Sequence, residues 1–258
     1  RTRYLPQRDM PDASSVAMHA GLPLTQRLAE RPPWSPLRLA FAIAGALFTA
    51  FFAAEAIFGR FAVVFGDATG ASIREAQINF RLTLVMILLV AYLPAAYAIG
   101  ARGARRTVEE LLPYLRSRGD APELLANSGR FDPLRLRRAG WIGVAYGFAI
   151  PIFTDRSIDA WFLRELSVEP LFQRMLILLI GWFVGRFLYS IWAESRRLTQ
   201  IGRDGVRVDL LDLRCFAPLT RQGLRYALLV VGVISISSLN LFDYEKPGLL
   251  TVVVVANV

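Results

Sequence analysis

Few side chains in this 258-residue chain could carry out chemistry. The sequence has one histidine, His19, and one cysteine, Cys215. A disulfide framework, a zinc site of Cys and His, an iron–sulfur cluster or a haem held by two histidines needs more of these ligands. The single lysine, Lys246, excludes a P-loop, and no G-x-S-x-G nucleophile elbow occurs. We therefore predict no cofactor, no metal site and no enzymatic activity.

The acidic residues do not form a catalytic pair either. Glu109 and Glu110 are neighbours, so in a helix their side chains point to different faces and cannot flank one substrate. The acidic residues between positions 155 and 169 fit no loop with a defined order of metal ligands. The informative polar residues are instead those that interrupt apolar runs.

Arg186 is the most informative of these residues. A guanidinium near the middle of a membrane costs roughly 2.5 kcal/mol or more on insertion scales, so Arg186 should face protein or water. Glu55 interrupts another apolar run, but the predicted depths put the two charges about 14 to 16 Å apart. Oxygen atoms at a depth similar to that of Arg186 belong to Tyr92, Tyr146, Ser235 and the backbone near Pro94. The candidate intramembrane polar site consists of Arg186, Glu55, Tyr92, Tyr146 and Ser235.

Both charges also have simpler interpretations. The Arg186 side chain could extend to the inner headgroups, and Glu55 could be an interfacial carboxylate paired with Arg60 or Arg81. The functional interpretations are a ligand or ion site around Arg186 and a proton or cation site at Glu55. The sequence leaves both pairs of alternatives open.

Apolar runs long enough to cross a bilayer are the elements that must position these residues. A helix needs about 20 residues to span the hydrocarbon, and 54% of this chain is hydrophobic, with a mean hydropathy of +0.40. We predict an all-α membrane protein, a polytopic helical bundle of about six transmembrane helices with short amphipathic interfacial helices. The predicted spans lie near residues 39–58, 82–100, 140–153, 175–193, 226–242 and 248–258.

Two segments flank or end this bundle. Residues 1–38 contain six prolines, which favours an extended proline-rich cytoplasmic arm, and the predicted bundle occupies 39–258. The run 248–258 would be about 16 Å long as a helix, half a bilayer. We expect this last span to be incomplete, because the natural chain continues past Val258 or because the segment is re-entrant. Arg1 in place of Met also suggests a trimmed amino end.

The distribution of basic residues predicts the orientation. The net charge is +9 and the sequence pI is about 10.4. The segments 1–38, 101–139 and 194–225 carry six, nine and seven basic residues, 22 in all, whereas the segments on the other side carry seven. Because basic loops resist translocation, we predict a multi-pass protein of a bacterial-type inner (plasma) membrane with a cytoplasmic amino terminus.

The same basic residues predict the partners. Topology and attraction to anionic lipid account for the basic excess, so we predict membrane lipids and no nucleic acid. Contacts with anionic headgroups on the cytoplasmic side are expected for Arg105, Arg106, Arg137, Arg138, Arg196 and Arg197. Within residues 105–118 an apolar stripe is formed by Val108, Leu111, Leu112 and Leu115. This pattern is typical of an amphipathic helix, which lies in the headgroup layer or docks on a neighbouring helix or partner.

Small residues spaced four apart predict close helix packing. The two motifs are Gly143-x-x-x-Gly147 and Gly181-x-x-x-Gly185, and such spacing lets helix backbones approach. Together they favour a compact bundle, although one of them could face another subunit. Partners of this kind are other membrane subunits or further copies of the chain.

These observations lead to two functional hypotheses. The first is a non-catalytic integral membrane protein that acts as a scaffold or accessory subunit of a membrane complex, or as the membrane anchor or sensor module of a longer chain. The alternative is a small transporter or channel with a polar intramembrane site around Arg186. Discontinuous helices and repeated halves are hallmarks of transporters, and the sequence shows Pro94 and Pro151 but no convincing repeat.

Overall fold

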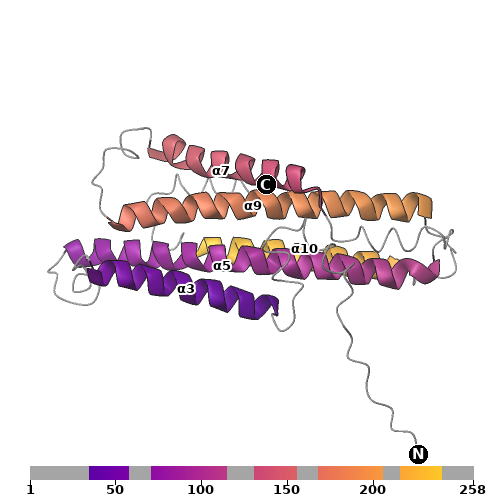
Figure 1. Ribbon diagram of the computed structural model, residues 1–258, viewed down its shortest axis with the longest axis horizontal. Helices are drawn as coiled ribbons and strands as arrows, with labels where there is room; N and C mark the ends of the chain where they lie inside the picture. The colour runs from indigo at the N-terminus through magenta and orange to yellow at the C-terminus, as the bar shows by residue number, and fades with distance from the viewer. Residues whose placement is uncertain (1–34, 58–70, 115–130, 156–167, 206–215, 240–258) are drawn as a thin grey trace, which may run out of the picture.

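The computed structural model describes residues 35–57, 71–114, 131–155, 168–205 and 216–239, which are almost entirely helical (Figure 1). The α-helices in these ranges are α3 (Pro36–Ile57), α5 (Ala71–Leu111), α7 (Pro133–Asp155), α9 (Val168–Gln200) and α10 (Ala217–Ser238). A 3-10 turn, η1 (Leu112–Tyr114), follows α5, and a π-helical turn, η2 (Ile201–Gly205), follows α9. The predicted last span, 248–258, and positions 1–34 of the predicted arm lie outside the described residues.

Four helices in the described ranges are long and apolar enough to cross a membrane. They cover Pro36–Ile57, Asn79–Tyr114, Leu171–Arg203 and Ala217–Ser238. The chain is therefore all helical in these ranges and has the helices of a membrane protein, whereas the prediction of about six spans is not confirmed. The predicted span 140–153 forms most of α7, which is not one of the four. The first turns of α7 carry three arginines and leave only a short apolar segment.

Local signals explain where two of the helices begin. The Ser35 hydroxyl accepts a hydrogen bond from the Arg38 backbone N–H at 3.1 Å, and Pro36 occupies the first helical position. Helix α3 therefore begins two residues before the predicted end of the arm at residue 38. In the same way, an Asp132 carboxylate oxygen accepts a hydrogen bond from the Leu134 N–H at 2.9 Å, just before α7.

Contacts at both ends of the bundle show how the helices run. At one end, an Arg221 guanidinium N–H of α10 donates to Glu110 near the end of α5. At the other end, an Arg81 guanidinium N–H near the start of the apolar part of α5 donates to the Leu239 carbonyl oxygen. Helices α5 and α10 are thus antiparallel. We use "basic end" for the end at which α5 and α9 finish and α7 and α10 begin, and "opposite end" for the other.

Helix α5 is central to the fold. It packs against α3, α9 and α10, and α7 packs on the far side of α9. Figure 1 shows α9 between α7 and α5, with α3 along the other side of α5. A helix that is apolar on all sides is normally buried. Of the four possible spanning helices α5 is the most buried, since 67% of the residues in its most apolar stretch are buried. Residues such as Val85, Ile87, Leu93 and Ala96 therefore supply much of the core.

Three hydrophobic clusters follow one another along α5. The cluster nearest the opposite end joins Ile87 and Val90 to Phe51 of α3 and Leu176 of α9. The middle cluster joins α5 to α7, α9 and α10 through Leu93, Ala96, Tyr97, Leu136, Phe187, Tyr226 and Leu229. The third, at the basic end, consists of Val108, Leu111, Leu198 and Ile201. The core is therefore continuous along α5, but the helices that contact α5 differ from one level to the next.

The basic ends of α5 and α9 correct one prediction. Residues 105–111 do not form a separate interfacial helix, because α5 continues without a break to Leu111. The apolar stripe predicted from Val108 and Leu111 is buried against Leu198 and Ile201, so it docks on α9 and η2 rather than lying in the headgroup layer. Leu115, the last residue of that predicted stripe, lies outside the described residues.

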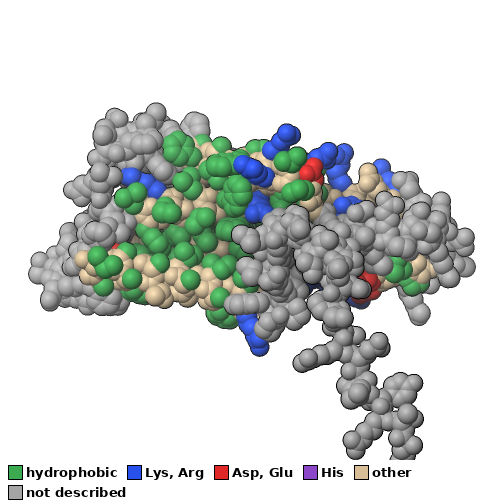
Figure 2. All heavy atoms as spheres, viewed as in Figure 1, with side chains coloured by type: hydrophobic (Ala, Val, Ile, Leu, Met, Phe, Trp, Pro, Cys, Tyr) green, Lys and Arg blue, Asp and Glu red, His purple; other side chains and the backbone are tan. Residues whose placement is uncertain are grey.

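We use "basic extension" for residues 101–114, 194–205 and 216–225, which continue the bundle beyond its apolar segments. At 1.5 Å per residue, the 41 residues of α5 extend about 62 Å, roughly twice the thickness of the bilayer hydrocarbon. In Figure 2, hydrophobic side chains predominate among the coloured side chains in the left and central part of the visible face, and more of the charged side chains lie toward the right. The apolar bundle and the basic extension are thus parts of the same continuous helices.

Candidate functional site: an arginine pocket and a buried polar cluster

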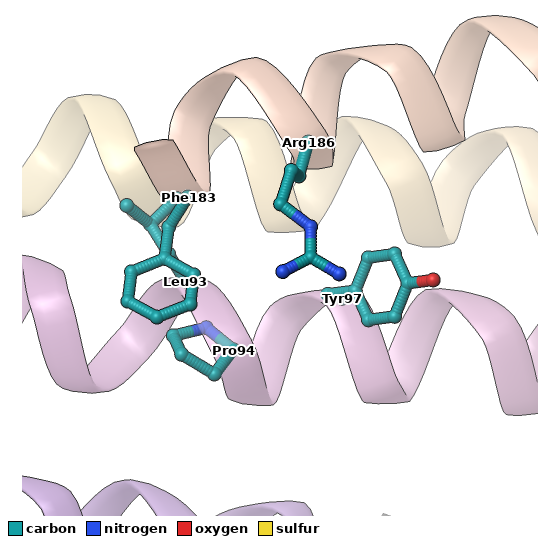
Figure 3. A pocket seen from close by; sticks show the side chains of 5 residues that line it. All are labelled: Leu93, Pro94, Tyr97, Phe183 and Arg186. Carbon is teal, nitrogen blue, oxygen red and sulfur yellow. The ribbon is translucent and has the colours of Figure 1, made fainter. Parts of the chain in front are cut away.

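Arg186 reaches from α9 to α5 inside the apolar part of the bundle. Its side chain extends across to α5 and its terminal nitrogens point toward the space between Pro94 and Tyr97 (Figure 3). Together with Leu93 and Phe183, these residues line a pocket, which we call the Arg186 pocket. The side chain crosses to α5 instead of following α9. The headgroup interpretation requires that it extend toward the basic end, and it does not.

The surroundings of this guanidinium are largely apolar and aromatic. Its central carbon lies 5.5 Å from the centre of the Trp182 ring, one turn earlier on α9, in a cation–π contact. Pro94 has no N–H group, so the Val90 carbonyl lacks its usual helical donor. Leu93 and Phe183 form the remaining walls. The pocket therefore offers the donors of Arg186 and, in its walls, mainly apolar surface.

The predicted partners of Arg186 are not gathered around it. The Tyr92 hydroxyl donates instead to the Leu229 carbonyl oxygen of α10, at 3.1 Å. Tyr146 is 58% exposed on α7, and Ser235 is exposed on α10. Of the predicted set, Pro94 lies beside Arg186, and Tyr97 is an additional neighbour that the sequence did not single out.

Glu55 is buried at a different level of the bundle. It follows Phe51 by one turn on α3, and the Phe51 ring lies 5.5 Å from that of Phe172 on α9. Phe172 and Arg186 are 14 residues apart on α9, about 21 Å along the helix. The structure thus places Glu55 toward the opposite end, away from the Arg186 pocket.

A buried polar cluster joins three helices where the basic extension begins. Glu194 of α9 and Gln222 of α10 are completely buried. The Gln222 amide donates to the Gly100 carbonyl oxygen of α5 at 3.3 Å, and Arg225 donates to the Gln222 side-chain oxygen. The Arg197 guanidinium lies 3.4 Å from a Glu194 carboxylate oxygen. Tyr226 completes the cluster, within electrostatic reach of Glu194, Arg225 and Arg197.

Two glycines of α5 make room for this cluster. A Cβ atom on Gly100 would lie 2.9 Å from the Tyr226 ring, and one on Gly103 would overlap the Arg225 guanidinium and lie 2.6 Å from the Gln222 side-chain oxygen. Helix α10 can therefore approach α5 closely only because both positions lack a side chain. The polar groups connect α5, α9 and α10 at one level.

The sequence contains a signal that could have identified Glu194. Phe187, Ser190, Glu194, Leu198 and Ile201 recur at intervals of three or four and are all buried. A carboxylate in such a stripe is buried with it. Hydropathy alone ends the predicted span at residue 193 and assigns Glu194 to the following loop, so it does not identify this buried carboxylate.

No protein family, curated protein or solved structure matches this chain. The arrangement of its own residues is therefore the basis for any functional argument. In the described ranges, no three His, Cys, Asp or Glu side chains lie close enough together to hold a metal ion. The polar features in these ranges that bear on function are the Arg186 pocket, the buried polar cluster and the exposed arginines.

The two glycine motifs face each other. A Cβ on Gly143 of α7 would overlap the Gly181 carbonyl oxygen of α9, and a Cβ on Gly181 would overlap the Gly143 carbonyl oxygen. A Cβ on Gly147 would lie 3.2 Å from the Ile177 carbonyl oxygen, and a Cβ on Gly185 would overlap the Ala139 carbonyl oxygen. The structure therefore pairs both motifs within one chain, at the interface of α7 and α9.

The arginines predicted to contact headgroups lie at the basic end. Five of them are exposed, namely Arg105, Arg106, Arg137, Arg138 and Arg196. Arg197 differs, because it is half-buried and pairs with Glu194. Some of the exposed arginines also interact locally: Arg105 lies 3.5 Å from Glu109, and Arg196 lies 4.9 Å from the centre of the Trp192 ring.

Proposed function

We propose that the chain is a non-catalytic integral membrane protein. It serves as a scaffold or accessory subunit of a membrane complex, or as the membrane anchor or sensor module of a longer chain. We assign it to a bacterial-type inner membrane with a cytoplasmic amino terminus, because its basic residues are distributed 22 to seven between the two sides. The observation that carries the proposal is the basic extension, in which spanning helices continue as a packed unit.

The basic extension has the properties of a docking platform. Its inner face has a core of its own, with Val108 and Leu198 buried against each other's helices. Its outer face presents exposed arginines such as Arg106. Since these residues lie on helices that continue into the apolar bundle, their spacing is fixed by the bundle. Such a surface can bind a subunit or a following domain, and its charge attracts anionic headgroups at the same time.

Photo-crosslinking in the native membrane tests the scaffold role. We expect a photoreactive residue in place of Arg106 to give one discrete protein product that also copurifies in mild detergent. The matched position is Leu228, on the exposed apolar face of α10, where the same probe should label lipid. A monomer without a crosslinked partner at Arg106 would contradict the scaffold role. An intact mass of 28.8 kDa for the natural protein would exclude the version with a longer chain.

A second candidate function is a small transporter or channel. It is favoured by one observation, the presence of Arg186 in a pocket beside Pro94 between two spanning helices. Charged residues and interrupted helices within a membrane often mark a substrate pathway. Flux through the reconstituted protein should then disappear in the Arg186→Leu variant while the protein remains folded. Equal flux in the variant and the wild type excludes this site.

A further inference from the structure

The Arg186 guanidinium has more hydrogen-bond donors than the described residues can satisfy. An arginine carries five N–H donors and no acceptor. In the described ranges, no oxygen atom accepts a hydrogen bond from Arg186 and no carboxylate lies within ion-pair distance of it; the Trp182 ring covers the guanidinium from 5.5 Å. The donors therefore point into the Arg186 pocket with no acceptor from these residues (Figure 3).

The two buried acidic residues of the described ranges lie at other levels of the bundle. Glu194 lies eight residues beyond Arg186 on α9, about 12 Å along the helix, and pairs with Arg197. Glu55 is buried nearer the opposite end. The positive charge of Arg186 thus stands in an apolar setting without an acid at its own level in the described ranges, and such a charge is costly unless an anion offsets it.

The shape of the guanidinium indicates which anion would fit. Its planar fork matches two oxygen atoms of one phosphate, and such charge-assisted pairs are the strongest hydrogen bonds in proteins. Leu93, Pro94 and Phe183 add apolar walls beside the fork. The pocket is small and open on one side, so a phosphate would meet the guanidinium at its mouth. Because the mouth lies between two spanning helices, the rest of the ligand would be apolar.

We propose that the Arg186 pocket binds a phosphate group, with the guanidinium as its donor. A phospholipid headgroup or a free phosphate could supply that group. The depth and the apolar walls favour the lipid, whose chains would lie along α5 and α9. This inference goes beyond the scaffold role and does not depend on it, since the crosslinking at Arg106 concerns a different surface.

Lipid binding by the delipidated wild-type protein tests the proposal directly. The probes are phosphatidylglycerol, a diacylglycerol with the same acyl chains but no phosphate, and inorganic phosphate, with bound ligands counted by native mass spectrometry. We expect phosphatidylglycerol to bind at least about tenfold more tightly than the diacylglycerol, as expected for hydrogen bonds to a charged group. Binding of inorganic phosphate without selectivity between the two lipids would identify a soluble anion as the ligand. Equal binding of both lipids and no binding of inorganic phosphate would overturn the proposal.

A matched pair of variants assigns the binding to Arg186. Arg196 repeats the same contact on the same helix, since it lies over Trp192 as Arg186 lies over Trp182, but it is exposed outside the pocket. Arg186→Gln should weaken phosphatidylglycerol binding about tenfold, whereas Arg196→Gln, which removes one exposed headgroup contact, should weaken it by no more than about twofold. An equal loss in both variants would mean unspecific attraction to basic surface and would refute the site. Should Arg186→Gln fail to fold, Arg186→Lys keeps the positive charge but not the planar fork, and unchanged phosphatidylglycerol binding in that variant would refute the guanidinium as the donor.

Discussion

Replacing Gly143 with alanine will destabilise the bundle by about 2 to 3 kcal/mol, as expected for overpacking at a tight contact. The added Cβ would overlap the Gly181 carbonyl oxygen and lie 3.1 Å from the Gly185 Cα atom. These are backbone atoms that cannot rotate away, so α7 must move off α9. Thermal or denaturant unfolding in one detergent measures the loss.

Gly45 provides the matched control for this substitution. It lies within α3, and a Cβ built on it meets no atom within 4 Å. Since alanine is the better helix former, Gly45→Ala should be neutral or stabilising, by up to about 1 kcal/mol. If Gly143→Ala were as stable as Gly45→Ala, the pairing of the two glycine motifs within one chain would be wrong.

Removing the Arg197 guanidinium should have an effect of similar size. The Arg197→Met variant leaves the completely buried Glu194 carboxylate without the cation 3.4 Å away. Breaking a buried pair costs about 3 to 5 kcal/mol. Because the Arg197 side chain is 31% exposed, solvent screens part of this interaction, and we expect a loss of about 2 to 3 kcal/mol. Unfolding measurements will show it as a lower midpoint.

Two further variants separate the ion pair from other effects. The Glu194→Gln/Arg197→Met double variant removes both charges and should recover to within about 1 kcal/mol of the wild type. Arg221→Met breaks the ion pair with Glu110, whose side chains are 60% and 45% exposed, and should cost less than about 1 kcal/mol. A double variant as unstable as Arg197→Met would show that the buried polar cluster does not depend on this charge pair.

The apolar spans were predictable because length and hydropathy alone determine whether a helix can cross a bilayer. Residues 82–100 were predicted as a span and lie within α5. The continuation of α5 to Leu111 was missed, since charged residues after Gly100 look like a loop when each segment is considered alone. Packing of Val108 and Leu111 on α9 stabilises the helix there, and such tertiary contacts are not visible in a single segment.

The partners of each polar residue were harder to predict, because the sequence does not show how a helix is rotated. Tyr146 and Ser235 have a suitable depth for Arg186, but both are exposed on other helices. Gln222 is completely buried although it lies in a charged stretch. Depth follows from counting residues along one helix, whereas neighbours depend on which faces of two helices meet.

The parallel arrangement of α5 and α9 has a mechanical consequence. The Gln173 amide of α9 donates to the Thr83 hydroxyl of α5 at 3.0 Å near the opposite end, and Leu198 packs on Val108 at the basic end. Because α5 and α9 are in contact near both ends, neither helix can slide along its axis independently of the other. A force or torque applied to the basic extension would therefore displace both helices together, including their other ends some 40 Å away.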